Sequence, residues 1–253
     1  MKKRLKLLLS NKGMTLTELI VAMFLTSVIL AIAVGMLAPV KNLMNTLKSN
    51  AHMDTISSTV DEYLRGTLHS AKGLKIVQLD NLNHVSDADL DSVKQFCTSA
   101  NKAKAIAVLN VNPQSGLNPD AADYEPPIYR IFELGDAAQD WTKLDNLMDK
   151  AHSGLTADVE EMKDYAVFLE PFYEGTSCAV EFYNDGGKRL QVASQCFRDG
   201  EMINQKHVLS FNLLNTGVSG FTDIAGSGVQ TDVDVEAQTE IAGRCYLILY
   251  TTL

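Results

Sequence analysis

The stretch SNKGMTLTE at residues 10–18, followed by uncharged residues from Leu19 to Ala38, decides the fold of this chain. Each residue of a helix adds about 1.5 Å, so twenty mainly apolar residues span roughly 30 Å, which matches the hydrocarbon core of a bilayer. The segment can therefore cross a membrane. We expect the spanning part to run from Leu19 to Val40.

Charge on either side of this segment predicts its orientation. Five basic residues and no acidic residue lie in the first thirteen positions, whereas the remaining residues hold 17 basic and 31 acidic side chains. The positive-inside rule then places the N-terminus in the cytoplasm and everything after the apolar segment outside. A body this acidic repels DNA and anionic lipid, so we expect no nucleic-acid binding by it.

The position of the small residues predicts where the chain is processed. A secretory signal peptide has its small-residue cleavage site after the apolar run. Here Ser10 and Gly13 come before that run, so the candidate processing point is Gly13 and the hydrophobic helix is kept.

Glu18 stands at the entrance of the membrane segment, where a carboxylate is costly. A glutamate here indicates either a functional role or an interfacial residue whose side chain reaches the lipid headgroups. The second alternative also fits a helix N-terminus, because the helix dipole stabilises a negative charge there.

Lys12-Gly13 followed by Met14 to Ile20 resembles the prepilin signal of type IV pilins and pseudopilins, over residues 11–40. The resemblance implies that a prepilin peptidase cuts between Gly13 and Met14 and methylates Met14, and that Glu18 acts in assembly. It also implies partners: other pilin subunits, a membrane platform protein, an assembly ATPase and membrane lipid. Met14 departs from the family, in which the first mature residue is most often Phe.

The chain divides into a leader at residues 1–13, a helix at 14–72 and an extracytoplasmic head at 73–253. Within the helix, residues 19–40 span the membrane and residues 41–72 form an amphipathic stalk. Its apolar residues recur at a spacing of three or four, at Leu43, Leu47, Ala51, Ile56, Val60, Tyr63, Leu64, Leu68 and Ala71. Pro39 predicts a kink or local melting near residues 35–39, because proline removes one helical hydrogen bond.

The head combines strand and helix signals without an internal repeat. Segments rich in β-formers are Leu74–Leu79, Ala105–Val111, Ile128–Leu134, Tyr165–Leu169, Cys178–Tyr183, Leu190–Phe197, Val208–Leu214 and Cys245–Thr251. Asn184 to Gly187 predicts a hairpin turn, Asp87–Phe96 and Asp136–Ala151 predict helices, and the proline-rich stretch Asn112–Pro127 predicts a surface loop. The fold class is therefore α+β: a long protruding N-terminal helix packed on an antiparallel sheet, which is pilin-like by resemblance.

The four cysteines are Cys97, Cys178, Cys196 and Cys245, and none of them has metal-ligand spacing. In an exported head they could form one or two disulfides with three alternative pairings, or they could remain buried thiols.

No nucleotide-binding, hydrolase, zinc-protease or EF-hand motif is present, so we expect neither an enzyme nor a cofactor. The histidines are scattered and are interpreted as surface or structural residues. The acidic run at 231–236, with Asp232 and Asp234, could hold calcium but fits an edge strand equally well. Aromatic residues could form a recognition surface, although such residues more often pack in a core; they are Tyr124, Tyr129, Trp141, Tyr173 and Tyr183.

The sequence thus predicts a non-enzymatic structural subunit of a type IV pilus or type II secretion-like filament, located in the cytoplasmic membrane and then in a cell-surface filament. The head, at residues 73–253, is large for a major pilin, which favours a minor pilin or pseudopilin. The alternative is a single-pass, membrane-anchored extracytoplasmic binding protein or sensor that keeps its leader. The sequence does not distinguish adhesion, motility, DNA uptake and secretion.

Overall fold

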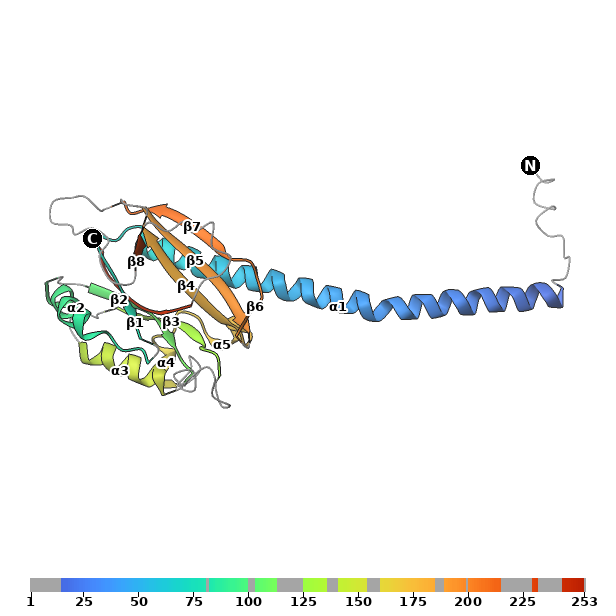
Figure 1. Ribbon diagram of the computed structural model, residues 1–253, viewed down its shortest axis with the longest axis horizontal. Helices are drawn as coiled ribbons and strands as arrows, with labels where there is room; N and C mark the ends of the chain where they lie inside the picture. The colour runs from blue at the N-terminus through green and yellow to red at the C-terminus, as the bar shows by residue number, and fades with distance from the viewer. Residues whose placement is uncertain are drawn as a thin grey trace. The chain divides into compact units, whose positions relative to one another are not determined.

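A computed structural model of the chain describes residues 15–80, 82–99, 103–112, 125–135, 141–153, 160–184, 189–198, 200–214, 229–231 and 243–252 (Figure 1). The chain forms two compact units, Met1–Ser49 and Asn50–Leu253. The helices are α1 (Leu16–Leu68), α2 (Asp87–Ser99), α3 (Trp141–His152), α4 (Glu160–Lys163) and α5 (Glu170–Tyr173). The strands are β1 (Gly73–Leu79), β2 (Ala103–Asn110), β3 (Tyr129–Leu134), β4 (Ser177–Asn184), β5 (Arg189–Arg198), β6 (Glu201–Met202), β7 (His207–Asn212), β8 (Val229–Thr231) and β9 (Cys245–Thr251).

Helix α1 is continuous over 53 residues and passes from the first unit into the second. Pro39 lies inside it, and residues 35–39 are helical. The predicted local melting is therefore wrong. Proline removes one hydrogen bond, but the turns on either side keep theirs, and a helix tolerates such a loss when the neighbouring residues are strong helix formers.

The first sheet has the order β1-β9-β2-β3, and all its pairs are antiparallel. The last strand of the chain, β9, thus lies in the centre between β1 and β2. Tyr246 and Tyr250 point to one face of β9, because side chains alternate along a strand. Residues 247 and 249 point to the other face, against which α2 and α3 pack.

The second sheet has the order β6-β5-β4-β8, and β7 also pairs with β5 (Figure 1). Strands β4 and β5 form the predicted hairpin, with Asn184 opposite Leu190; its turn lies outside the described residues. The pairing of β4 with β8 is parallel, so the head is not purely antiparallel. Among the described residues of the head the strands form two sheets, where the sequence predicted one.

The part of α1 that follows residue 50 packs between these sheets. Met53, Ile56, Val60, Leu64 and Leu68 are buried and belong to the continuous core of the head. Their spacing of three or four residues keeps them on one face of the helix. The stalk was predicted from residue 41; α1 has a buried apolar face from residue 53 onward, whereas Leu43 and Leu47 remain 59% and 58% exposed.

The segment predicted as a strand at Tyr165–Leu169 is instead a turn and bend that makes one isolated bridge, between Phe132 and Ala166. Its β-formers do reach the edge of β3, where the amide of Val167 donates to the carbonyl of Ile131. The short helix α5 then begins at Glu170, with Pro171 in its first turn, and stops the pairing from extending. The prediction of a strand at this place is therefore wrong.

Candidate functional site

The candidate functional site is the N-terminal part of α1, and its first turn is a capping box formed by Thr15 and Glu18. The hydroxyl of Thr15 accepts a hydrogen bond of 3.2 Å from the amide of Glu18. In return, Oε2 of Glu18 accepts hydrogen bonds of 2.9 Å and 3.0 Å from the amide and hydroxyl of Thr15. This reciprocal pair satisfies two amides that a helix N-terminus otherwise leaves without partners.

Glu18 therefore has a structural role that the sequence prediction did not include, although the pattern T-x-x-E at residues 15–18 is the signature of a capping box. Only one of its two carboxylate oxygens, Oε2, accepts hydrogen bonds in the capping box. Within the described residues, no hydrogen bond of Oε1 is found, so this oxygen can accept one from outside the subunit. Glu18 is exposed and lies beside the apolar surface of the helix.

Every residue from Thr15 to Lys48 is exposed, including the whole predicted membrane segment from Leu19 to Val40. Large apolar side chains point outward all around the helix, among them Leu16, Phe24, Leu30 and Leu37, each at least 65% exposed. Helix α1 is long and apolar enough to cross a membrane. An all-round apolar surface is suited to lipid or to other helices and not to water.

The few polar side chains of this segment bond to their own helix. The hydroxyl of Thr26 donates to the carbonyl of Ala22 at 2.8 Å, and that of Ser27 donates to the carbonyl of Phe24 at 2.7 Å. In hydrocarbon each polar group needs a partner within the protein, and these bonds provide it. The segment can thus enter lipid without an unsatisfied hydroxyl at these two positions.

The processing residues Gly13 and Met14 lie outside the described residues, so cleavage and methylation there remain predictions. The acidic positions Asp232 and Asp234 also lie outside them. No group of three or more His, Cys, Asp or Glu side chains that could hold a metal is found in the part of the chain that the structure describes.

Of the two interpretations of the aromatic residues, packing in a core holds for three of them. Tyr129, Tyr173 and Tyr183 are buried in the head. Tyr173 packs against Phe172 and lies under the guanidinium of Arg130, whose carbon is 4.1 Å from the ring centre. Tyr124 and the side chain of Trp141 lie outside the described residues.

Polar contacts that join α1 to both sheets were missed by sequence reasoning. The hydroxyl of Tyr63 donates to Oε2 of Glu133 on β3 at 2.7 Å, and the hydroxyl of Tyr250 donates to Oε1 of the same carboxylate at 2.9 Å. On the second sheet, His207 of β7 bonds to Asp61, which is fully buried on α1. These partners are far apart in the sequence, so no local pattern indicates them.

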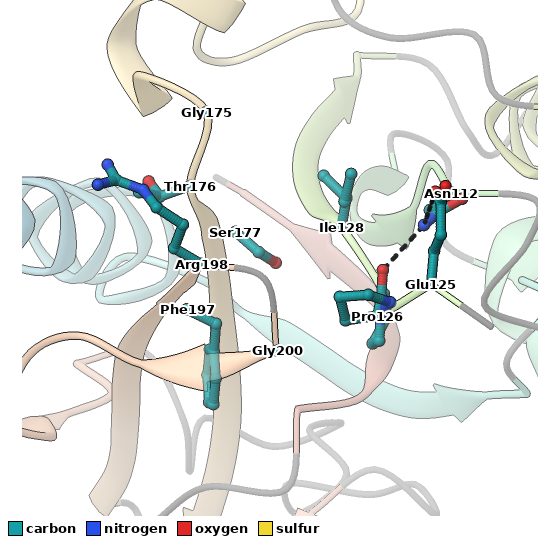
Figure 2. Close-up of a pocket in the computed structure, with 11 residues that line it drawn as sticks. Asn112, Glu125, Pro126, Ile128, Gly175, Thr176, Ser177, Phe197, Arg198 and Gly200 are labelled. Atoms are coloured by element: carbon teal, nitrogen blue, oxygen red, sulfur yellow. Dashed lines mark hydrogen bonds between the residues drawn. The ribbon is translucent and has the colours of Figure 1, made fainter. Parts of the chain in front are cut away.

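A pocket of about 340 Å³ lies where the segment 125–128 meets β4 and β5 (Figure 2). The amide of Asn112 at its edge donates to the carbonyl of Pro126 at 2.9 Å, and the hydroxyl of Ser177 accepts from the amide of Tyr129 at 2.8 Å. Both side chains thus hold the walls of the pocket together. Because these polar side chains have a structural role, we assign no function to the pocket.

The cysteines Cys97, Cys178, Cys196 and Cys245 are buried and are thiols in the structure. Cys178 and Cys196 lie directly opposite one another on β4 and β5.

Residues 8–34 match the family model of the prokaryotic N-terminal methylation motif. Comparisons with curated proteins and with solved structures give no match. The long N-terminal helix on antiparallel sheets defines an α+β protein of pilin-like fold. The chain carries the type IV pilin and pseudopilin signal at its N-terminus, as the sequence predicted. This motif implies processing by a prepilin peptidase and assembly with other pilins.

Proposed function

We propose that the chain is a structural subunit, a minor pilin or pseudopilin, of a type IV pilus or type II secretion-like filament. It is cleaved after Gly13, methylated on Met14 and inserted with its N-terminus in the cytoplasm and its head outside. One observation carries the proposal: α1 is exposed and apolar from Leu19 to Val40 and is still exposed at Leu47, yet the same helix is part of the head core from Met53. An anchor that served only to hold a domain at a membrane would not need to continue into the domain core.

The apolar surface of α1 serves two environments in turn. In the membrane it faces lipid, and in the filament it faces the helices of sister subunits. Helices in lipid associate through packing and polar contacts, because lipid is as apolar as the side chains themselves. A polar group that finds its partner only in the filament therefore gives assembly its direction and register.

Glu18 is that polar group in our proposal. Cleavage creates an α-amine on Met14, and such an amine has a reference pKa of about 7.7 to 8.0, so it is largely protonated at neutral pH. The oxygen Oε1 of Glu18, which the capping box leaves unused, accepts a hydrogen bond from the Met14 amine of a neighbouring subunit. Leaving one partner of such a buried pair alone typically costs about 3 to 5 kcal/mol.

The remaining partners follow from the same proposal. A membrane platform protein and an assembly ATPase supply the site and the energy for extraction from the bilayer. The large head, residues 73–253, favours a minor subunit or pseudopilin over a major pilin. The head has no enzymatic role in this proposal and serves as the part that the filament displays.

The N-terminal mass of the membrane-extracted chain tests the proposal. We expect a chain that begins at methylated Met14 and lacks the thirteen leader residues. A chain that keeps all 253 residues would instead identify a single-pass anchored binding protein or sensor. Because the two masses differ by the leader and by a methyl group, one spectrum distinguishes the two classes.

A further inference from the structure

The β4–β5 hairpin places two thiols face to face. Cys178 is the register partner of Cys196, and both side chains are fully buried. The neighbouring thiol of Cys196, together with burial, raises the pKa of Cys178 well above the usual range, and the thiol of Cys178 lowers the pKa of Cys196. The two side chains thus lie side by side on one face of the hairpin.

The backbone shows which kind of pair they form. The amide of Cys196 donates to Oδ1 of Asn204 at 2.8 Å, and its carbonyl accepts from the amide of Ile203 at 3.0 Å. Both groups point away from β4, so Cys178 and Cys196 form a non-hydrogen-bonded pair. In such pairs the Cα atoms are about 4.5 Å apart. Disulfides need about 4.4 to 6.8 Å, so this pair can close without movement of the backbone.

We propose that Cys178 and Cys196 form a disulfide in the exported head, while Cys97 and Cys245 remain thiols. The inference rests on the proposed export, because disulfides persist in oxidising compartments. The register partner of Cys245 is Leu79 on the neighbouring strand, and Cys97 lies in helix α2. Burial raises the pKa of Cys97, and it raises that of Cys245 to about 12, so both stay protonated.

The oxidant is the disulfide of an extracytoplasmic thiol–disulfide oxidoreductase. A thiolate of the hairpin attacks this disulfide, which breaks the S–S bond of the oxidant and forms a mixed disulfide. The second cysteine then attacks the hairpin sulfur of that mixed disulfide and releases the oxidoreductase as a dithiol. The two protons that the hairpin thiols lose are taken up by the two sulfurs of the reduced oxidant.

Helix α1 determines when this step takes place. The sulfur of Cys196 lies 3.4 Å from the hydroxyl of Ser57 and 3.6 Å from the carbonyl of Met53, both on α1. The helix therefore covers the sulfur pair in the folded head. Oxidation takes place on the hairpin before α1 packs onto it, and afterwards α1 shields the disulfide from reductants.

Peptide mapping tests the assignment on the full chain extracted from membranes. Free thiols are blocked with N-ethylmaleimide in denaturant, and the chain is digested with trypsin without reductant. The sequence allows cleavage after Lys163, Lys188, Arg189 and Arg198, so the two cysteines fall in separate peptides, 164–188 and 190–198. We expect these peptides as one linked species that reductant separates, with two blocked thiols per chain.

Cysteine variants and a measurement of Tm complete the test of the disulfide assignment. A Cys97→Ser/Cys245→Ser chain keeps the linked species, and Cys178→Ser converts Cys196 into a blocked thiol. A disulfide that closes a loop of about 15 to 20 residues restricts the unfolded chain, so a chain reduced in denaturant and refolded should have a Tm about 6 to 12 °C below that of the oxidised chain.

Protease added to intact cells establishes on which side of the membrane the head lies. A digested, exposed head with four blocked thiols, or with a linkage between other cysteines, overturns the disulfide assignment alone. A head protected from protease overturns the proposed export and the disulfide with it.

Discussion

The hydroxyl of Tyr63 on α1 and the carboxylate of Glu133 on β3 are joined by a hydrogen bond of 2.7 Å. Tyr250 of β9 bonds to the other oxygen of the same carboxylate, so Glu133 connects the helix to two strands of the first sheet. Burial and the contact with Glu133 raise the pKa of Tyr63, which keeps it a donor over the physiological pH range. The carboxylate of Glu133 thus accepts one hydrogen bond from the helix and one from the sheet.

Removal of one of these donors should destabilise the head. We expect Tyr63→Phe to lower the free energy of unfolding by about 1.5 to 3 kcal/mol, since hydrogen bonds to charged groups are worth about that much. Tyr250→Phe is the matched variant, because it frees the other oxygen. The double variant should cost more than the sum of the two, since it leaves Glu133 without either tyrosine. Denaturation followed by the fluorescence of the single Trp141 measures this, and strict additivity would contradict a shared carboxylate.

Leu64 and Leu47 provide a comparison of one residue type at two places on α1. Leu64 is fully buried and Leu47 is 58% exposed. We expect Leu64→Ala to destabilise the head by about 2 to 5 kcal/mol, whereas Leu47→Ala should change it by less than about 0.5 kcal/mol. Leu47→Ala should instead reduce recovery in filaments, because its surface is left for sister helices. Equal filament recovery of Leu47→Ala and wild type would show that this surface is not used.

The Asp61–His207 contact predicts that stability depends on pH. The hydrogen bond that His207 donates to Asp61 raises the pKa of His207, and burial raises the pKa of Asp61 despite this bond. Because His207 holds its proton more tightly in the folded state, its contribution to stability is fully present below the unfolded pKa of His, about 6.5, and is lost as pH rises through the folded value. His207 is 46% exposed, so this loss should stay under about 1 kcal/mol.

Asp61→Asn should flatten this dependence, because it removes the charge that holds the proton on His207. His84→Ala is the control for loss of a histidine, since His84 lies at the surface, 3.6 Å from Asp149. The measurement is urea denaturation of the detergent-extracted chain at several pH values. An unchanged slope in Asp61→Asn would exclude this pair as its source.

Substitutions at Glu18 separate its two roles. Glutamine can serve in a capping box as glutamate does but carries no charge. If the carboxylate pairs with the Met14 amine of a neighbour, Glu18→Gln and Glu18→Ala should both be inserted, fold normally and enter filaments poorly. If capping is its only role, Glu18→Gln should assemble as wild type does. The readout is the ratio of subunit in sheared filaments to subunit in the membrane fraction.

Gly13→Val should block processing, because the branched side chain stands at the residue after which the peptidase cuts. We expect the full-length precursor to accumulate in the membrane and to be missing from filaments. Mass spectrometry of the extracted chain measures this, and Lys12→Gln is a matched control that alters the leader without altering the cleaved bond. A trimmed Gly13→Val chain would refute cleavage at this position.

The sequence predicted those elements of the fold that depend on a local pattern of residue types. The apolar segment, the stalk periodicity and most strands follow from residue type and spacing, and the structure has them within a few residues. Exposure along α1 was not predictable in this way, because Leu47 and Leu64 obey the same periodicity and differ only in what covers them. The strand expected at Tyr165–Leu169 failed for a related reason. Its β-formers lie at the edge of β3, where Arg130 binds Glu170 with bonds of 2.9 Å and 2.8 Å and holds the turn.

Only those parts of the candidate site that are formed by residues close together in the sequence were predictable. Gly13, Met14 and Glu18 were predicted from their position before the apolar run and from the resemblance to prepilins, whereas the capping bond from Thr15 needed the helix to start at one particular residue. Asp61 and His207 are 146 positions apart, and their meeting requires both the docking of α1 and the pairing of β7 with β5. Contacts of this kind depend on the whole fold, so sequence periodicity does not reveal them.

Two of the contacts between α1 and the sheets bear on how the head would carry force. Tyr63 is bonded to the first sheet and Asp61 to the second, two positions apart on the helix. Tension along α1 would therefore load both sheets at once, so the helix could not be pulled from one sheet without straining its attachment to the other.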